Sequence, residues 1–190
     1  MLRITSGSFR GRLIQSLKGT STRPTSERLR QAWLNSLQMN LPDARILDLF
    51  SGSGALGLEA LSRGAGFVLF VEESAKAAQV IRENIKILNL EEQTQILQKK
   101  AELVSSEISE DAPFDFIFMD PPYHQGFEEK ILSTFSWSTL LTESGRLCIE
   151  SAYRKEGAYQ EPKALSVVRH EKYGDSQLSF YERIKKEREA

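Results

Sequence analysis

Apolar residues along the chain fall into short continuous runs that alternate with segments of helical spacing. The runs have the length of buried strands, and we expect strands beginning at residue 46 and at 67–71, 94–98, 114–119 and 146–149. Helices are expected between them, at 55–63, at 74–88, from residue 101 and at 128–135. Strands that alternate with helices in this way predict an α/β fold with a mainly parallel, doubly wound sheet.

The two ends of the chain depart from this alternation. Residues 165–173 and 178–184 are strand-like and flank the turn residues Gly174, Asp175 and Ser176, which predicts a closing antiparallel hairpin. Residues 2–17 alternate in part and contain two glycines, so we predict two short strands in a hairpin ahead of the main fold.

A helix is expected shortly after Pro24. Its apolar residues recur at helical spacing and predict one buried face, made of Leu29, Ala32, Trp33 and Leu37. Arg28 and Arg30 are expected on the outside of this helix.

The chain has 190 residues, which suits one domain with helices on both faces of a sheet. We therefore expect a single domain over residues 1–190, with residues 1–24 as a small N-terminal hairpin extension. No apolar run approaches the length of a membrane span, and the start does not resemble a signal peptide, so a cytoplasmic protein is expected. The single cysteine, Cys148, is expected in the core, and with only His124 and His170 beside it no metal site is expected.

The net charge of −1 hides a basic N-terminal region. Residues 1–40 carry seven basic side chains and one acid, Glu27. Such a region predicts an acidic partner, for which nucleic acid is the common choice, and Arg10, Arg12 and Arg23 are the candidate RNA contacts.

Three glycines follow the strand that begins at residue 46. Gly52, Gly54 and Gly57 form a G-x-G-x-x-G pattern ahead of a helix, where backbone can approach a ligand closely. Glu72 lies 20 residues beyond Gly52 at the end of the next apolar run, a spacing that suits an acid binding ribose hydroxyls. The pattern fits both NAD-dependent dehydrogenases and S-adenosylmethionine (SAM)-dependent methyltransferases. Asp48 favours the second, because a carboxylate at the strand end repels a pyrophosphate and attracts the cationic sulfonium and amino group of SAM.

A second motif follows the strand at 114–119, where the chain reads Asp120-Pro121-Pro122-Tyr123. Ligands of open α/β sheets bind beyond the carboxyl ends of the strands, so this tetrapeptide is expected to face the same crevice as the glycines. The prolines fix the backbone, Asp120 supplies a charged acceptor and Tyr123 a flat face. These groups suit an exocyclic amine on a planar base, with the nitrogen lone pair directed at a methyl group.

The tetrapeptide is similar to the (Asn/Asp)-Pro-Pro-(Tyr/Phe) motif of amino-group methyltransferases. Further motifs resemble the RsmD family from residue 3 to residue 181: Arg23-Pro24-Thr25, the segment from Asp48 to Ala60, Tyr173-Gly174-Asp175 and Leu178-Ser-Phe-Tyr181. The resemblance implies a class I, Rossmann-like, seven-stranded sheet and the transfer of one methyl group from SAM to the N2 atom of a guanine in 16S ribosomal RNA. It also implies a substrate presented by the small ribosomal subunit, and we expect a monomer with neither metal nor membrane partner.

The expected site residues fall into three groups. The catalytic group is Asp120, Pro121, Pro122 and Tyr123; the cofactor-binding group is Asp48, Ser51, Gly52, Gly54, Glu72 and Ala101; the RNA-binding group is Arg10, Arg12 and Arg23. The chain departs from the family at Lys100-Ala101, where an acid usually precedes the alanine and contacts the adenine amine, so backbone groups are expected to read adenine here. Three other functions stay open: an adenine-N6 methyltransferase acting on DNA or RNA, a dehydrogenase, and a non-catalytic SAM- or RNA-binding assembly factor.

Overall fold

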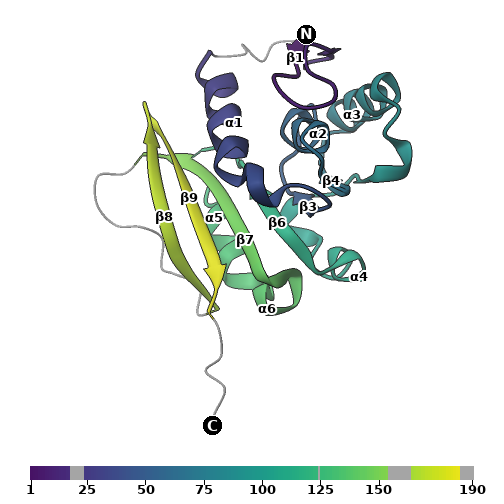
Figure 1. Cartoon of the computed structure of the whole chain (residues 1–190). Coiled ribbons are helices and arrows are strands. Elements are labelled where there is room, and N and C mark those ends of the chain that lie inside the picture. Colours follow the sequence, from purple (N-terminus) through teal and green to yellow (C-terminus); the bar gives the residue numbers. More distant parts are fainter. Residues whose placement is uncertain (18–23, 124, 154–163, 185–190) are drawn as a thin grey trace. The chain divides into compact units, whose positions relative to one another are not determined.

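The computed structural model describes residues 1–17, 24–123, 125–153 and 164–184. The chain divides into two compact units, Met1–Ala101 and Glu102–Ala190. Each unit has its own sheet strands and helices, and each is described separately below (Figure 1). The expectation of one domain over residues 1–190 stays a prediction.

Three parallel strands and two helices form the centre of the first unit. The strands are β3 (Arg45–Asp48), β4 (Phe67–Val71) and β5 (Thr94–Leu97), in the spatial order β5-β4-β3. Asp48 pairs with Phe70, and Val71 pairs with Leu97, so the carboxyl ends of the three strands lie at one edge. The helices α2 (Ala55–Ser62) and α3 (Ala75–Leu88) connect these strands, as predicted.

Local sequence signals fix these helices. The Ser74 hydroxyl caps α3 by accepting a hydrogen bond from the Ala77 N–H at 3.3 Å, and Asn89 ends the helix in the left-handed conformation. In α2, a Cβ at Gly57 would lie 2.4 Å from the Phe70 ring, so only glycine allows the helix to pack this closely on β4.

The N-terminal hairpin is confirmed as two very short antiparallel strands, β1 (Leu2–Arg3) and β2 (Leu13–Ile14). The helix α1 (Pro24–Leu37) follows, and Leu29, Trp33 and Leu37 are buried in it as predicted. The exposed position predicted for Arg30 is wrong, because only 9% of this residue is accessible to solvent. Its guanidinium is buried since the fully buried Glu59 carboxylate lies 3.8 Å from Arg30 Nε and supplies a charge of opposite sign.

The second unit contains one parallel and two antiparallel strand pairings. Strand β6 (Phe114–Met119) pairs in parallel with β7 (Leu141–Ala152). Strand β9 (Ser176–Arg183) pairs antiparallel with both β7 and β8 (Leu165–Tyr173), and the three run side by side in Figure 1. The β8–β9 hairpin was predicted, whereas β7 begins five residues earlier than expected. Short helices complete the unit: α4 (Ile108–Asp111), α5 (Phe127–Thr134) and α6 (Trp137–Leu140).

The strand order of the complete sheet is β5-β4-β3-β6-β7-β9-β8. The predicted fold class is therefore confirmed: seven strands, mainly parallel, with an antiparallel C-terminal hairpin. Single 3-10 turns lie at Gln38–Asn40, Glu91–Gln93 and Ala101–Leu103; the last stands where a regular helix was expected. Cys148 is buried in β7, as predicted. Among the helices that the structure describes, none is long and apolar enough to cross a membrane.

Candidate active site

The glycine loop joins the end of β3 to the start of α2. Gly52 and Gly54 have φ angles of +55° and +77°, a region that glycine adopts readily and other residues avoid. Gly54 is also the residue that precedes the first turn of α2, so the free N–H groups of that turn lie directly after it. The loop therefore brings the positive end of α2 to the end of β3, where it favours a negatively charged or electron-rich ligand group.

Asp48 lies at the base of this loop and is 2% exposed. Burial raises the pKa of Asp48 to about 7, and the charge of Glu72 adds to the rise, while backbone hydrogen bonds from Gly57 and Phe50 oppose it. Its Oδ2 atom is buried and has no hydrogen-bond partner among the described residues. A buried carboxylate oxygen with a vacant lone pair is costly in isolation, so the site fits a cationic ligand group that pairs with it.

Glu72 follows β4 and bridges the glycine loop to the start of α3. Its Oε2 accepts a hydrogen bond from the Gly52 N–H at 2.8 Å, and its Oε1 accepts one from the Ser74 N–H at 2.8 Å. Each carboxylate oxygen has further acceptor capacity, so the carboxylate can bind a pair of hydroxyl groups while it holds the loop.

Replacing Glu72 by alanine tests this placement. Glu72→Ala removes charge-assisted hydrogen bonds of about 1.5–3 kcal/mol, so we expect SAM affinity to fall at least about tenfold. The measurement is calorimetric titration of the folded variant with SAM. The neighbouring Glu73→Ala, which removes an exposed acid next in the chain, is the matched control and should leave the affinity unchanged. Parental affinity in folded Glu72→Ala would exclude Glu72 from the cofactor site.

Two further polar side chains hold the loop in place. The Ser51 hydroxyl lies 2.8 Å from the Asp48 carbonyl oxygen and 3.1 Å from the Val71 carbonyl oxygen, and so ties together the ends of β3 and β4. Asn84, fully buried in α3, donates to the Ser53 carbonyl oxygen at 2.9 Å and exchanges hydrogen bonds with the backbone of Gln15. Asn84 was not predicted from the sequence, although a polar residue on the apolar face of a predicted helix is a usable signal.

The residues after β5 are the third part of this edge. Ala101 is 5% exposed and begins a 3-10 turn. Lys99 and Lys100 precede it. Both side chains are basic and exposed, so this chain has no acid at the position where the family usually has one. The prediction that backbone groups read adenine at Ala101 stays a prediction.

In the second unit, Asp120-Pro121-Pro122-Tyr123 directly follows β6. Asp120 is exposed, Pro121 is buried and Tyr123 is half-buried. The tetrapeptide thus has a buried anchor and an acidic side chain open to solvent, which suits binding of a ligand amine.

Tyr123 is held by residues of two other strands. Its hydroxyl donates to Glu150 Oε1 at 2.6 Å and lies 2.7 Å from Ser176 Oγ. Burial raises the pKa of the Tyr123 phenol, and the hydrogen bond to Glu150 raises it further. Burial also raises the pKa of Glu150, while hydrogen bonds with Tyr123, Ser176 and Asp120 oppose that rise. These contacts orient the ring. Neither partner was predicted from the sequence, because both lie on β7 and β9, far from Tyr123 in the chain.

The three predicted RNA contacts differ in their surroundings. Arg10 is exposed in the N-terminal hairpin. Arg12 is exposed as well, but its Nη2 donates to the Ile87 carbonyl oxygen at 2.6 Å, so part of its guanidinium holds the hairpin on α3. Arg23 lies outside the described residues. No group of metal-binding side chains occurs within residues 1–17, 24–123, 125–153 and 164–184.

The acid and glycine loop of the first unit and the Asp-Pro-Pro-Tyr motif of the second unit each agree with comparisons to known proteins. The family model described as "Conserved hypothetical protein 95" matches residues 2–182. The chain is 34% identical to the "Putative rRNA methyltransferase YlbH" of Bacillus subtilis, over 96% of this chain and 99% of that one. It is 30% identical to the "Ribosomal RNA small subunit methyltransferase D" of Escherichia coli, over 96% of this chain and 90% of that one. The chain belongs to the RsmD family of methyltransferases.

A solved structure of similar sequence supports the fold assignment. "Putative methyltransferase yhhF from Escherichia coli" superposes with a TM-score of 0.81 at 29% identity and covers 96% of this chain and 97% of that one. The match extends over nearly the full length of both chains, so both units of this RsmD-family methyltransferase take part in it.

Proposed function

We propose that this methyltransferase transfers one methyl group from SAM to the exocyclic N2 atom of a guanine in 16S ribosomal RNA of the small subunit. The observation that carries the proposal is the buried Asp48 Oδ2, which lies at the base of the glycine loop without a partner among the described residues. Together with the Asp-Pro-Pro-Tyr motif, it fits a cationic methyl donor and an amine acceptor. The name of the Escherichia coli relative supports small-subunit rRNA as the substrate.

The cofactor assignment separates this function from that of a dehydrogenase. The carboxylate of Asp48 attracts the ammonium and sulfonium of SAM but repels the pyrophosphate of NAD. Calorimetric titration with SAM and with NAD tests the assignment. We expect binding of SAM and none of NAD, and binding of NAD alone would contradict the cofactor assignment.

Each site residue has a proposed role in the reaction. Bound SAM supplies an activated methyl group on its sulfonium. Asp48 and the loop at Gly52 and Gly54 hold the cofactor, with Glu72 on the ribose hydroxyls, while the Asp120 carboxylate and the Pro121 carbonyl accept the two N–H groups of the guanine amine. Tyr123 stacks on the base. Such base–aromatic stacking contributes about 1–3 kcal/mol to the free energy of binding. Asp120 need not take a proton before the transfer, because the methylated nitrogen carries a positive charge directly after it, is acidic in that form, and releases its proton to water.

The basic N-terminal region is proposed to bind the RNA backbone, in a cytoplasmic and monomeric enzyme. Removing Arg10, Arg12 and Arg23 together as alanines should weaken RNA binding in a salt-dependent way. Each lost phosphate contact flattens the slope of log K against log salt by up to about 0.7–0.9. SAM affinity should not change. The measurement is filter binding of 16S rRNA over a series of salt concentrations, and an unchanged slope would identify this region as a solvated surface only.

The alternative substrate is adenine N6 in DNA or RNA, and the alternative function is a non-catalytic assembly factor. Incubation with methyl-labelled SAM and 16S rRNA, small ribosomal subunits or duplex DNA, followed by nucleoside analysis, distinguishes them. We expect label in guanosine of RNA alone, and label in adenosine of RNA would favour the adenine enzyme. Label in DNA would favour the adenine enzyme, and no label in either RNA or small subunits would favour the assembly factor.

A further inference from the structure

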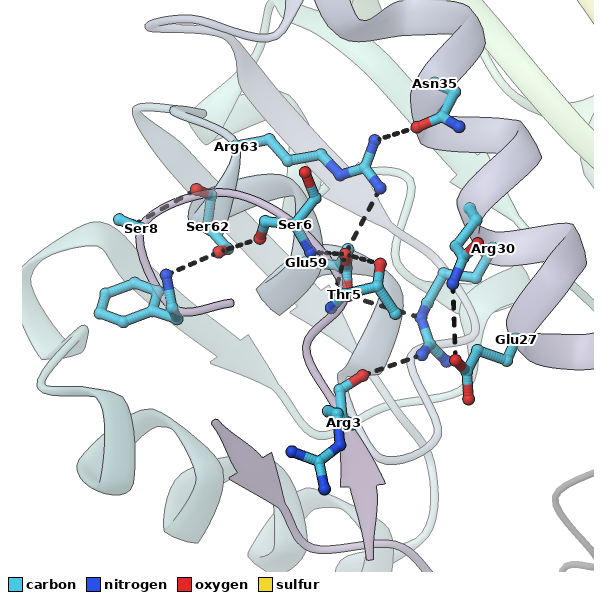
Figure 2. Close-up of polar contacts among 12 residues, drawn as sticks. Arg3, Thr5, Ser6, Ser8, Glu27, Arg30, Asn35, Glu59, Ser62 and Arg63 are labelled. Atoms are coloured by element: carbon cyan, nitrogen blue, oxygen red, sulfur yellow. Dashed lines mark hydrogen bonds and ion pairs between the residues drawn. The ribbon is translucent and has the colours of Figure 1, made fainter. Parts of the chain in front are cut away.

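A polar hollow lies on the first unit, outside the residues proposed to bind SAM. Its volume is about 300 Å³, and it is lined by Thr5, Ser6, Arg10, Gln31, Asn35 and Arg63. These residues come from the N-terminal segment, from α1 and from the end of α2, and several of them are drawn in Figure 2. None of the lining side chains is acidic, and two are cationic.

The walls of the hollow are held together by Glu59, which is fully buried in α2. Its carboxylate accepts hydrogen bonds from the backbone N–H groups of Thr5 and Ser6 at 3.0 Å, and from the Thr5 hydroxyl. The same carboxylate lies 3.8 Å from Arg30 Nε and 3.4 Å from Arg63 Nη2 (Figure 2). A buried acid with this many donors fixes the N-terminal segment on two helices, so the hollow is preformed.

A second contact brings the N-terminal segment close to α2. The Ser8 N–H donates to the Ser62 carbonyl oxygen at 2.7 Å, and the Ser62 hydroxyl donates to the Ser6 carbonyl oxygen at 2.6 Å. A Cβ at Gly7 would lie 1.7 Å from the Ser62 carbonyl oxygen, so only glycine allows this approach. The segment is therefore held against the end of α2 as well as by Glu59.

The groups left over in the hollow are mainly hydrogen-bond donors. Asn35 uses its Oδ1 to accept from Arg63 Nη1 at 2.6 Å, which leaves its NH₂ group as a donor. The Ser6 hydroxyl and the Arg10 guanidinium make no hydrogen bond within the described part of the chain. Among the described residues, Gln31 makes only a long contact of 3.4 Å to Glu27. Arg10, Arg30 and Arg63 outnumber the two nearby acids, Glu27 and Glu59, so the hollow has a positive local charge.

We propose that this hollow binds a backbone phosphate of the RNA substrate, together with part of the adjoining ribose. Arginine, serine, threonine, asparagine and glutamine side chains are the groups that contact phosphates in nucleic-acid complexes, and all five types line the hollow. The proposal rests on the proposed function, because it requires an RNA substrate. It adds a positioning site on α1 and α2 to the exposed arginines of the hairpin.

A charge introduced at Gln31 tests the site and, of the contacts within the described residues, removes only the 3.4 Å contact to Glu27. Gln31→Glu keeps the shape of the side chain and places a carboxylate in the hollow four residues from Glu27. Gln79→Glu is the matched control, because Gln79 is exposed on α3 and likewise bonds to an acid four residues away, Glu83, at 3.1 Å. Both variants change the net charge equally.

The measurement is filter binding of in vitro transcribed 16S rRNA over a range of salt concentrations. We expect Gln31→Glu to weaken binding roughly fivefold at low salt and to flatten the salt slope by up to about 0.7. Gln79→Glu should match the parent, and both should bind SAM with parental affinity. Equal RNA binding by the two variants, whether parental or weakened, would overturn the phosphate site.

Titration with inorganic phosphate at constant ionic strength separates an RNA site from a free-anion site. We expect weak phosphate binding in the parent and none in Gln31→Glu, alongside the loss of RNA affinity. If Gln31→Glu abolishes phosphate binding but leaves RNA affinity at the parental value, the hollow binds a free anion and the proposal is overturned. A parent protein that binds no rRNA would instead contradict the proposed function itself, and this site with it.

Discussion

Asp120→Ala is expected to lower kcat for ribosomal substrate by about 10²–10³, the loss seen when one hydrogen-bond acceptor or donor used in a transition state is removed. Asp120 is exposed directly after β6, where it can accept an N–H group of the guanine amine as the nitrogen attacks. Since this interaction strengthens during the reaction and does not involve the cofactor, SAM affinity should change little. The measurement is single-turnover methyl transfer at saturating SAM.

Two control variants separate the role of Asp120 from a general effect of charge. Asp120→Asn keeps one acceptor oxygen and the shape of the turn, so partial activity should survive. Asp115→Asn removes an acid from the same strand, one that accepts a hydrogen bond from the Thr142 hydroxyl at 3.2 Å, and kcat should stay parental. Near-parental turnover by Asp120→Ala would exclude the orienting role of Asp120. Glu150, which shares a hydrogen bond with Asp120, would then be the next candidate for that role.

Asp48→Asn is expected to weaken SAM binding by about 10² or more while it stabilises the SAM-free protein. The loss of affinity follows because a buried cation without its partner costs about 3–5 kcal/mol. The gain in stability has a separate cause. Asp48 is 2% exposed and its Oδ2 has no partner in the described residues, so its negative charge is unfavourable when no ligand is bound.

The pH dependence of both effects follows from the pKa of Asp48, which burial raises to about 7. An unfolded aspartate has a pKa of about 3.9, so between about pH 4 and pH 7 the folded protein holds a proton that the unfolded chain has lost. The free energy of unfolding of the parent should therefore fall across this window, by up to about 4 kcal/mol. Asp48→Asn should lack this component. SAM affinity of the parent should rise as the pH rises to 7 and then level off, because the cation binds the ionised carboxylate.

Chemical unfolding and SAM titration between pH 4 and pH 9 check these expectations. Asp43→Asn is the matched control, since Asp43 is exposed, has a φ of +60° that asparagine tolerates, and belongs to the same unit. It should change neither property. SAM affinity that does not depend on Asp48 would exclude this residue from the cofactor site.

Most of the fold was predicted from the apolar pattern, because buried parallel strands have continuous apolar runs. The predicted strands at 67–71 and 114–119 match β4 and β6 at both ends. The early start of β7 was missed, since Thr142, Glu143 and Ser144 are polar and do not indicate a strand. The helix expected from residue 101 is replaced by a 3-10 turn and the four-residue α4. The segment that has helical spacing is short, and most of its residues are polar.

The candidate site was predicted only where local sequence determines it. Glycines with positive φ, an acid at a strand end and a proline pair have local signatures, so the residues around Gly52 and Asp120 could be named in advance. Glu59 and Glu150 have no such signature, and Asn84 has only that of a polar residue on the apolar face of a predicted helix. Their roles depend on partners 26–69 residues away in the chain, such as Ser176 for Glu150 and Gln15 for Asn84. Only the folded structure brings these groups together.

Nucleoside analysis of the methylated RNA measures the proposed reaction most directly. Unmodified small ribosomal subunits are incubated with methyl-labelled SAM and either the parent protein or Asp120→Ala, and the RNA is digested to nucleosides. We expect the label in N2-methylguanosine of 16S rRNA with the parent, and about 10²–10³-fold slower labelling with Asp120→Ala. Label in N6-methyladenosine, or in no nucleoside at all, would contradict the proposed function.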